Sequence, residues 1–272
     1  RLGRFDNAID NFLAGYKVDP KWVAILTSLS MTYDALNDRK NAKKFLQEAI
    51  ENYPSASYVH EMKIRWNFED NKETREAKIA IENAIISTDI GAIMDIILQV
   101  YIFEKDYKTP LDLLKNLERN ILTHQSSLNA KDYYIGLLYD LMGENKLAIS
   151  YYKSALSILE KKLNENIGDA MLHAAISRVY IRLGLIEEAV KSAQLSVALV
   201  SPARDAWYGV INKTNLAYIY ESSNLIDDAL HTLSEVYNKP FGPKKAELLL
   251  YWEWENLRTN SRFQSMINNN NI

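Results

Sequence analysis

The four histidines are the side chains in this sequence best suited to acid–base or metal chemistry. They are His60, His124, His173 and His231, and they are scattered along the 272 residues. A helical zinc site needs a second histidine four residues from the first, and His60 has Ile64 at that position. The spacing therefore predicts isolated surface or groove histidines and no metal site.

Paired carboxylates are the other candidates for catalysis. Glu187-Glu188 and Asp227-Asp228 begin segments with helical periodicity, where acidic side chains complement the helix dipole. A catalytic pair needs a cleft that shifts its pKa, and nothing in the pattern indicates one. The chain also lacks cysteine, Gly-rich phosphate loops and a Gly-x-Ser-x-Gly motif. We therefore expect a protein that is not an enzyme and has no cofactor.

The composition favours helices and disfavours two classes of partner. Only 9 Gly and 6 Pro occur, fewer than a turn-rich β protein needs. The formal charge of −3 disfavours nucleic acid, whose binding is driven by clustered Lys and Arg. The most apolar run, 90–103, is shorter than the roughly 20 residues of a membrane span. We expect a cytoplasmic protein with no disulfides, and a fragment, because residue 1 is Arg.

A helix–turn–helix pattern organises the chain and is clearest over residues 133–155. Gly136 lies on the first expected helix, Gly143 at the break, and Ala148 and Ala155 on the second. Small residues at these places allow two antiparallel helices to approach closely. Aromatic residues recur once per unit at a position that we assign to core packing rather than to base stacking: Tyr33, Phe68, Tyr101, Tyr139, Tyr180 and Tyr220.

The pattern repeats with a spacing of 34 residues near the N-terminus. This spacing separates Ala8 from Ala42, Gly15 from Ala49, and Pro20 from Pro54. With this register the chain resembles the tetratricopeptide repeat (TPR) family, whose helix–turn–helix unit has the same length. The resemblance implies an all-α fold, a right-handed α-α superhelix of antiparallel helix pairs with a C-terminal capping helix. Each pair would bury the open face of its neighbour.

The spacing then lengthens. The unit at 90–120 is the most degenerate, and its Pro110 is acceptable only in a first helical turn. The alanine equivalent to Ala148 recurs 41 residues later at Ala189 and 40 further at Ala229. We expect the extra residues to lengthen helices around 156–164 and around 199–207.

These units predict three regions. Residues 1–243 form the solenoid, with a truncated first repeat and about six full ones. Residues 244–267 form the C-terminal capping helix and extension, and 268–272 a disordered tail. The truncated repeat exposes Leu2, Phe5 and Phe12, so we expect an upstream repeat or a second copy of the chain to cover this face.

The last 70 residues or so carry a narrower resemblance. The segments SPARDAWYGVINKTNLAYIYESSNLIDDAL and LLLYWEWENLRTNSRF are similar to the C-terminal TPR regions of bacterial multidomain signalling proteins. Such proteins carry a Ser/Thr kinase, a nucleotide cyclase or a winged-helix domain. The chain departs from them at Trp252 and Ser261, where proline is usual. The resemblance implies an accessory module of a larger signalling or regulatory protein.

In a TPR superhelix the first helices of the pairs line the concave groove. Counting from the packed positions predicts a partner-binding set on this face: Asp34, Met62, Trp66, Glu69, Asp95, Gln99, Tyr133, Leu137, Arg178, Arg182 and Tyr218. The N-terminal part of this set is acidic, which favours a peptide with a basic and an apolar part. The Lys and Asn clamp of chaperone-binding TPR domains is absent from the matching positions.

Three functions fit these observations. The first is a non-catalytic scaffold that binds a peptide or protein segment in the groove. The second is a regulatory domain that self-associates and controls an attached enzyme or DNA-binding domain. The third, an RNA-binding helical repeat, needs a basic groove that the charge of −3 disfavours.

Overall fold

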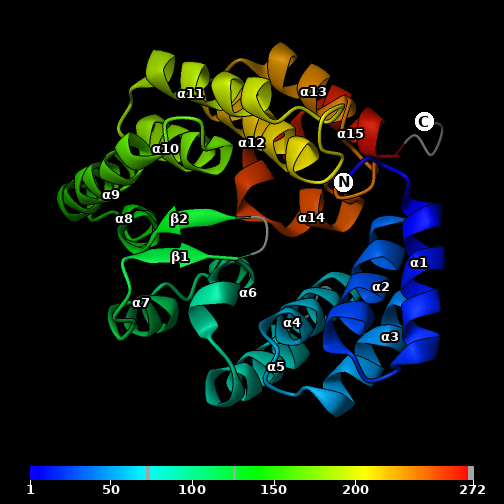
Figure 1. Cartoon of the computed structure of the whole chain (residues 1–272). Coiled ribbons are helices and arrows are strands. Elements are labelled where there is room, and N and C mark those ends of the chain that lie inside the picture. The colour runs from blue at the N-terminus through cyan, green and yellow to red at the C-terminus, as the bar shows by residue number, and fades with distance from the viewer. Residues whose placement is uncertain (72–73, 125–126, 269–272) are drawn as a thin grey trace.

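Helices form almost all of the regular structure in this computed structural model, which describes residues 1–71, 74–124 and 127–268 (Figure 1). In the N-terminal half they are α1 (Phe5–Val18), α2 (Val23–Ala35), α3 (Arg39–Asn52), α4 (Ser57–Asn71), α5 (Thr74–Ser87), η1 (Ile90–Ile93), α6 (Met94–Phe103) and α7 (Lys108–Lys115). The later ones are α8 (Lys131–Leu141), α9 (Asn145–Glu165), α10 (Ala170–Arg182), α11 (Ile186–Leu199), α12 (Tyr208–Ser222), α13 (Ile226–Ser234), α14 (Lys245–Leu250), η2 (Trp252–Thr259) and α15 (Ser261–Asn268).

After α1 come six successive pairs of packed helices, from α2–α3 to α12–α13. This is the all-α superhelix of helix pairs that the repeat pattern predicts. In five of these pairs a residue with positive φ lies two residues beyond the end of the first helix: Asn37, Lys105, Gly143, Gly184 and Asn224. The next N–H then bonds back to the carbonyl of the repeated tyrosine, for example Asp38 to Tyr33 at 2.8 Å. This bond satisfies a carbonyl that the helix end leaves free.

The close helix approach predicted at Gly136 is present. A Cβ at this position would lie 2.8 Å from the Tyr152 ring and 3.2 Å from the carbonyl oxygen of Ala148. Tyr152, Ala148 and Ala155 are all buried. The glycine therefore lets α8 lie directly against α9.

Two local features differ from the sequence expectations. A short antiparallel hairpin, β1 (Ile121–Thr123) and β2 (Leu128–Ala130), lies between α7 and α8 and pairs Leu122 with Asn129. The expected helix extension is real in α9, which has 21 residues, but wrong around 199–207. There α11 ends at Leu199, and Asp205 accepts hydrogen bonds from the N–H groups of Trp207 and Tyr208. These bonds stabilise a turn in place of a longer helix.

The superhelix curls into a ring, so that the N-terminus lies beside the C-terminal part of the chain (Figure 1). Arg1 forms an ion pair with Asp205 at 2.8 Å, and the Arg1 carbonyl accepts a hydrogen bond from the Ala206 N–H. Phe5 packs on Phe241, and the Phe241 ring also stacks on Trp207. Of the three side chains expected to be exposed, Leu2 is 78% exposed, whereas Phe5 and Phe12 are partly buried.

The region after α13 is three short helices rather than one. α15 packs beside α13 and buries Phe263 and Ile267, as expected of a cap. α14 and η2 instead run along the inner side of the ring, where α14 contacts α4, and η2 contacts both α6 and α12 (Figure 1). Of the predicted tail, Asn268 ends α15 and 269–272 lie outside the described residues.

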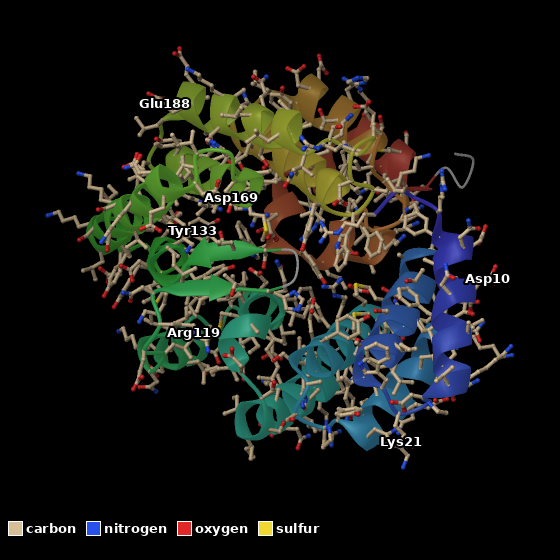
Figure 2. All side chains as sticks on the ribbon, in the orientation of Figure 1. Asp10, Lys21, Arg119, Tyr133, Asp169 and Glu188 are labelled. Carbon is tan, nitrogen blue, oxygen red and sulfur yellow. The ribbon has the colours of Figure 1, made fainter. Side chains whose placement is uncertain are left out.

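Figure 2 shows which labelled side chains point away from the ring and which lie inside it. Asp10, Lys21 and Glu188 point away from the molecule, and all three are exposed. Tyr133 lies among packed helices and is fully buried. The candidate ligand-binding side chains lie at the centre of the ring.

The Gly136 contact gives a test of the packing. Gly136→Ala should lower the free energy of unfolding by about 1–3 kcal/mol, because the new methyl group overlaps Tyr152. Gly168→Ala is the matched control, since a Cβ there has nothing within 4 Å. Urea unfolding of both variants measures the difference. Equal stability of the two would contradict the close α8–α9 contact.

Candidate functional site

The inner face of the ring holds most of the predicted binding residues, and much of it is covered by the chain's own C-terminal segment. We call residues 251–254, Tyr-Trp-Glu-Trp, the inner segment. Tyr251 stacks on Phe68 with ring centres 6.4 Å apart, and its hydroxyl donates to Glu69 at 3.0 Å. Glu69 therefore recognises a side chain of this chain itself.

Gln99 and Arg178 hold the next part of the inner segment. The Gln99 amide donates to both carboxylate oxygens of Glu253, at 3.1 and 2.8 Å, and its carbonyl accepts from the Trp252 N–H. Arg178 lies 3.9 Å from the same carboxylate. Burial raises the pKa of Glu253, and the positive charge of Arg178 opposes that effect.

Arg182 and Tyr218 hold the two tryptophans. The Arg182 guanidinium lies over the Trp252 ring, 5.1 Å from its centre, and donates to the Tyr218 hydroxyl at 2.9 Å. The Tyr218 ring meets Trp252 and Trp254 edge to face. Such cation–π and aromatic contacts are side-chain specific, so this part of the face recognises the inner segment by its residue types.

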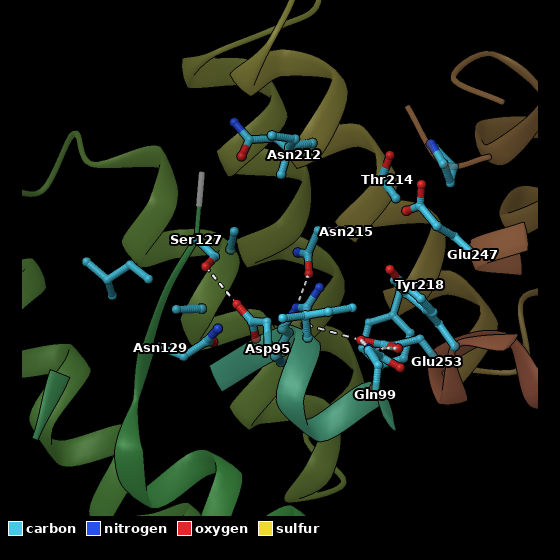
Figure 3. A pocket seen from close by; sticks show the side chains of 18 of the residues that line it. Asp95, Gln99, Ser127, Asn129, Asn212, Thr214, Asn215, Tyr218, Glu247 and Glu253 are labelled. Atoms are coloured by element: carbon cyan, nitrogen blue, oxygen red, sulfur yellow. Dashed lines mark hydrogen bonds and ion pairs between the residues drawn. The ribbon is translucent and has the colours of Figure 1, made fainter. Parts of the chain in front are cut away.

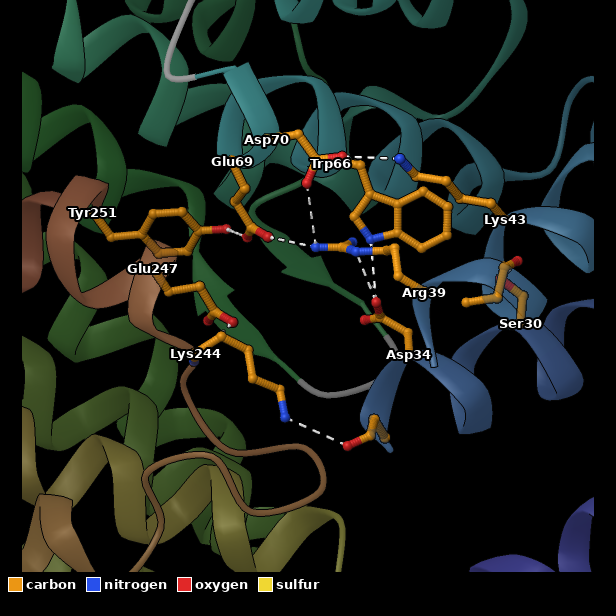
Figure 4. A network of polar contacts seen from close by, with 12 residues as sticks. Ser30, Asp34, Arg39, Lys43, Trp66, Glu69, Asp70, Lys244, Glu247 and Tyr251 are labelled. Atoms are coloured by element: carbon orange, nitrogen blue, oxygen red, sulfur yellow. Dashed lines mark hydrogen bonds and ion pairs between the residues drawn. The ribbon is translucent and has the colours of Figure 1, made fainter. Parts of the chain in front are cut away.

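The acidic end of the predicted set is neutralised by cations from α3 (Figure 4). Arg39 lies 3.2 Å from Asp34 and 3.4 Å from Glu69, and its guanidinium covers the Trp66 ring. Trp66 donates to Asp34 at 3.2 Å. The expectation of an acidic surface counted only first helices and therefore missed Arg39.

The remaining predicted residues are either buried or already bonded within the chain. Tyr133 and Leu137 are 0% and 1% exposed and belong to the largest hydrophobic cluster, so a partner at the groove surface does not reach them. Met62 is also buried, within the cluster of α1–α4. Asp95 accepts hydrogen bonds from Ser127 and Tyr134. These hydrophobic side chains of the first helices face the neighbouring helix and not the groove. Residue spacing alone does not distinguish the two orientations.

An ion-pair group that the sequence did not indicate lies beside this face. Glu61 of α4 bonds Arg65 and His124, the latter at 2.9 Å. Burial alone would raise the pKa of Glu61, but these two cations lower it to about 2. Burial alone would lower the pKa of His124, and Glu61 reverses that effect and raises it. His124 thus fastens the β-hairpin to α4.

The other histidines make local contacts. His60 bonds the Pro54 carbonyl, His173 is buried and bonds the Ile167 carbonyl, and His231 is exposed. Within the described ranges no group of three or more His, Asp or Glu side chains could hold a metal ion. No helix of that part of the chain is long and apolar enough to cross a membrane.

Two cavities of about 230 and 330 Å³ meet at the centre of the ring, against α4, α10, α12 and α14. Figure 3 looks into the first, where dashed lines join Ser127 to Asp95 and Gln99 to Glu253. The second is bordered by Met31, Asp34 and Lys244. Tyr251, Glu253 and Trp254 of the inner segment line the first cavity, so the segment and the cavity share the inner face.

A sequence-family comparison agrees with the repeat pattern. The model described as "Tetratricopeptide repeat" matches residues 23–55 and 133–160, which contain α2–α3 and most of α8–α9. Two helix pairs of the chain therefore match this repeat. Modules of this kind generally mediate protein–protein interactions. No curated protein matches the chain.

Two solved structures are similar at low identity. PilW, described as a widely conserved type IV pilus biogenesis factor, is 12% identical, with 93% of this chain and 90% of that chain covered and a TM-score of 0.33. The TPR domain of P58(IPK) is 13% identical, with coverages of 97% and 92% and a TM-score of 0.30.

The central carboxyls predict a pH-dependent stability. Burial and the charge of Glu69 raise the pKa of Glu247 to about 7, whereas Arg65 and Lys244 lower it. A carboxyl with a raised folded-state pKa stabilises the fold below its unfolded-state pKa, and this contribution disappears as pH rises through about 7. The free energy of unfolding should therefore fall between pH 5.5 and pH 8.5.

The variant Glu247→Gln isolates this effect. It should unfold with a shallower pH dependence than the native chain and be more stable at pH 8.5 by about 1–2 kcal/mol, a value reduced for the water that reaches the cavity. Glu255→Gln, at an exposed position of η2, is the control and should follow the native curve. Urea titrations at several pH values measure this, and parallel curves for Glu247→Gln and the native chain would refute it.

Proposed function

We propose that this protein is a non-catalytic interaction module that holds a segment of a partner protein at the inner face of its ring. The observation that carries the proposal is the inner segment. Residues 251–254 are held by stacking, by a bidentate amide–carboxylate contact and by a cation–π contact. An inner face built to recognise one peptide in this way is suited to recognise another.

The partner docks beside the inner segment rather than in its place. Leu248, Leu250, Trp254 and Leu257 are all buried. Each such burial stabilises by roughly 1.5–3 kcal/mol, so releasing the inner segment together with α14 and η2 costs about as much as unfolding a small domain. The partner would reach the 330 Å³ cavity at the half-buried Asp34, with Met62 and Glu69 in the cavity wall. Trp66 lies next to it and donates to Asp34.

Within this proposal the chain serves as an accessory arm of a bacterial, cytoplasmic signalling protein. The likeness of residues 201–230 and 248–263 to such arms supports this setting.

A second candidate, self-association that controls an attached domain, is favoured by exposed apolar residues at both ends of α1. Leu2, Val18 and Trp22 are 78%, 87% and 54% exposed. Light scattering tests it, because Val18→Ser with Trp22→Ser should abolish a concentration-dependent mass.

A charge reversal tests the docking surface. Asp34→Lys should release a bound partner protein, because it replaces the carboxylate that faces Arg39 at this cavity with a further cation. Asp10→Lys makes the same change on the outer surface and should leave binding intact. Crosslinking followed by mass spectrometry compares the two variants, with thermal unfolding as a check on folding. Retention of every partner by a folded Asp34→Lys protein would overturn the assignment.

A further inference from the structure

The two central cavities share a wall. On this wall lie a guanidinium group and a carboxylate that each have free hydrogen-bonding positions. Arg65, Arg178 and Glu247 line both cavities, from α4, α10 and α14 respectively. The side chains of Arg65 and Arg178 keep 29% and 25% of their exposure although packed helices surround them. Solvent, and a molecule of matching size, therefore reaches them through the centre of the ring.

Arg178 has hydrogen-bonding capacity to spare. Its Nε donates to Asn215 at 2.7 Å, and its nearest carboxylate, Glu253, lies 3.9 Å from Nη1, beyond hydrogen-bond distance. Among the residues that the structure describes, its two terminal nitrogens donate to none within 3.5 Å. Arg65 uses Nη2 on Glu61, and its buried Nε has no partner in the same set. The terminal nitrogens of Arg178 are thus available to one small anionic group, and Arg65 adds its positive charge to the same wall.

Glu247 offers the opposite charge. In the described part of the chain it accepts one hydrogen bond, from the Lys244 N–H at 3.3 Å. The other carboxylates of the first cavity are occupied. Glu61 is held by Arg65 and His124, Asp95 by Ser127 and Tyr134, and Glu253 by Gln99. A cationic group that entered the cavity would find its acceptor at Glu247.

The rest of the lining suits a small organic molecule. Asn212, Thr214 and Asn215 place polar groups along the α12 side (Figure 3). Met171, Ala174 and Ala175 give an apolar patch on α10. At about 230 Å³ the first cavity is smaller than a typical site for a drug-sized ligand. The inner segment excludes an extended peptide.

We propose that the central cavity binds a free α-amino acid, with its carboxylate on Arg178 and Arg65 and its ammonium group on Glu247. The apolar patch of α10 receives the side chain. A zwitterion is the ligand that uses both charges of the shared wall at once, whereas a simple anion leaves Glu247 unpaired. This site is separate from the partner surface at the cavity mouth, so either assignment can fail without the other.

The ligand experiment uses the native chain and the twenty amino acids singly at millimolar concentration. Isothermal titration calorimetry should find binding by at least one of them. Its des-amino analogue and its α-carboxamide should each bind at least tenfold more weakly, because each loses one of the two ionic contacts. This comparison needs no variant and does not depend on how a mutation affects folding.

The variants test the assigned roles. Arg178→Gln and Glu247→Gln should each weaken binding at least tenfold. Arg75→Gln removes an exposed arginine of α5 that lines neither cavity, and it should bind as the native chain does. No binding by any amino acid, equal binding of the des-amino analogue, or full affinity in both cavity variants would overturn the proposal. A crystal structure soaked in the best amino acid that shows only water in the cavity would do the same.

Discussion

The docking of α14 and η2 against the inner face is the contact on which the rest of the structure depends. A superhelix of helix pairs is held together only by neighbouring pairs, so distant pairs need not touch. Here Tyr251 meets α4, Trp252 and Glu253 meet Gln99 of α6, and Trp252 also meets Arg182 of α10. One short segment thereby joins pairs that are far apart in the sequence.

This docking determines the charge pattern of the interior. An inner face open to water tolerates isolated charges, but a covered one requires each charge to have a partner. Glu61 is bonded by Arg65 and His124, and Glu69 by Arg39 and Tyr251. Buried pairs of this kind add little net stability, but loss of one member leaves the other uncompensated. These ion pairs therefore determine the position of the inner segment, and they contribute little to the free energy that holds it there.

The helix pairs could be predicted from the sequence because their determinants are local. A small residue at Gly136, a left-handed position at Gly143 and a 34-residue spacing each act within one unit. The hairpin at 121–130 and the turn at 200–207 escaped prediction. The first replaces part of a degenerate unit, and the second depends on Asp205 capping a turn.

The site was predicted only in part, because its composition depends on contacts between distant residues. The inward residues Glu69, Gln99, Arg178, Arg182 and Tyr218 were found by counting along first helices, and all of them contact the inner segment. The residues that complete the site come from elsewhere: Arg39 from a second helix, His124 from a hairpin, Glu247 from α14. Repeat periodicity contains no information about these, since none occupies a repeated inward position.

A filled groove changes which ligands are physically reasonable. An open superhelix offers a long concave surface, and affinity there comes from many contacts along an extended chain. In this ring the inner segment already occupies part of that surface, and the two central cavities are compact spaces bounded by charged groups from several helices. A ligand in such a space gains from the match of a few charges at fixed positions, with little surface to bury. The C-terminal segment therefore does more than cap the last pair: under the proposed ligand binding, it converts a surface suited to extended peptides into a cavity that selects by charge and size.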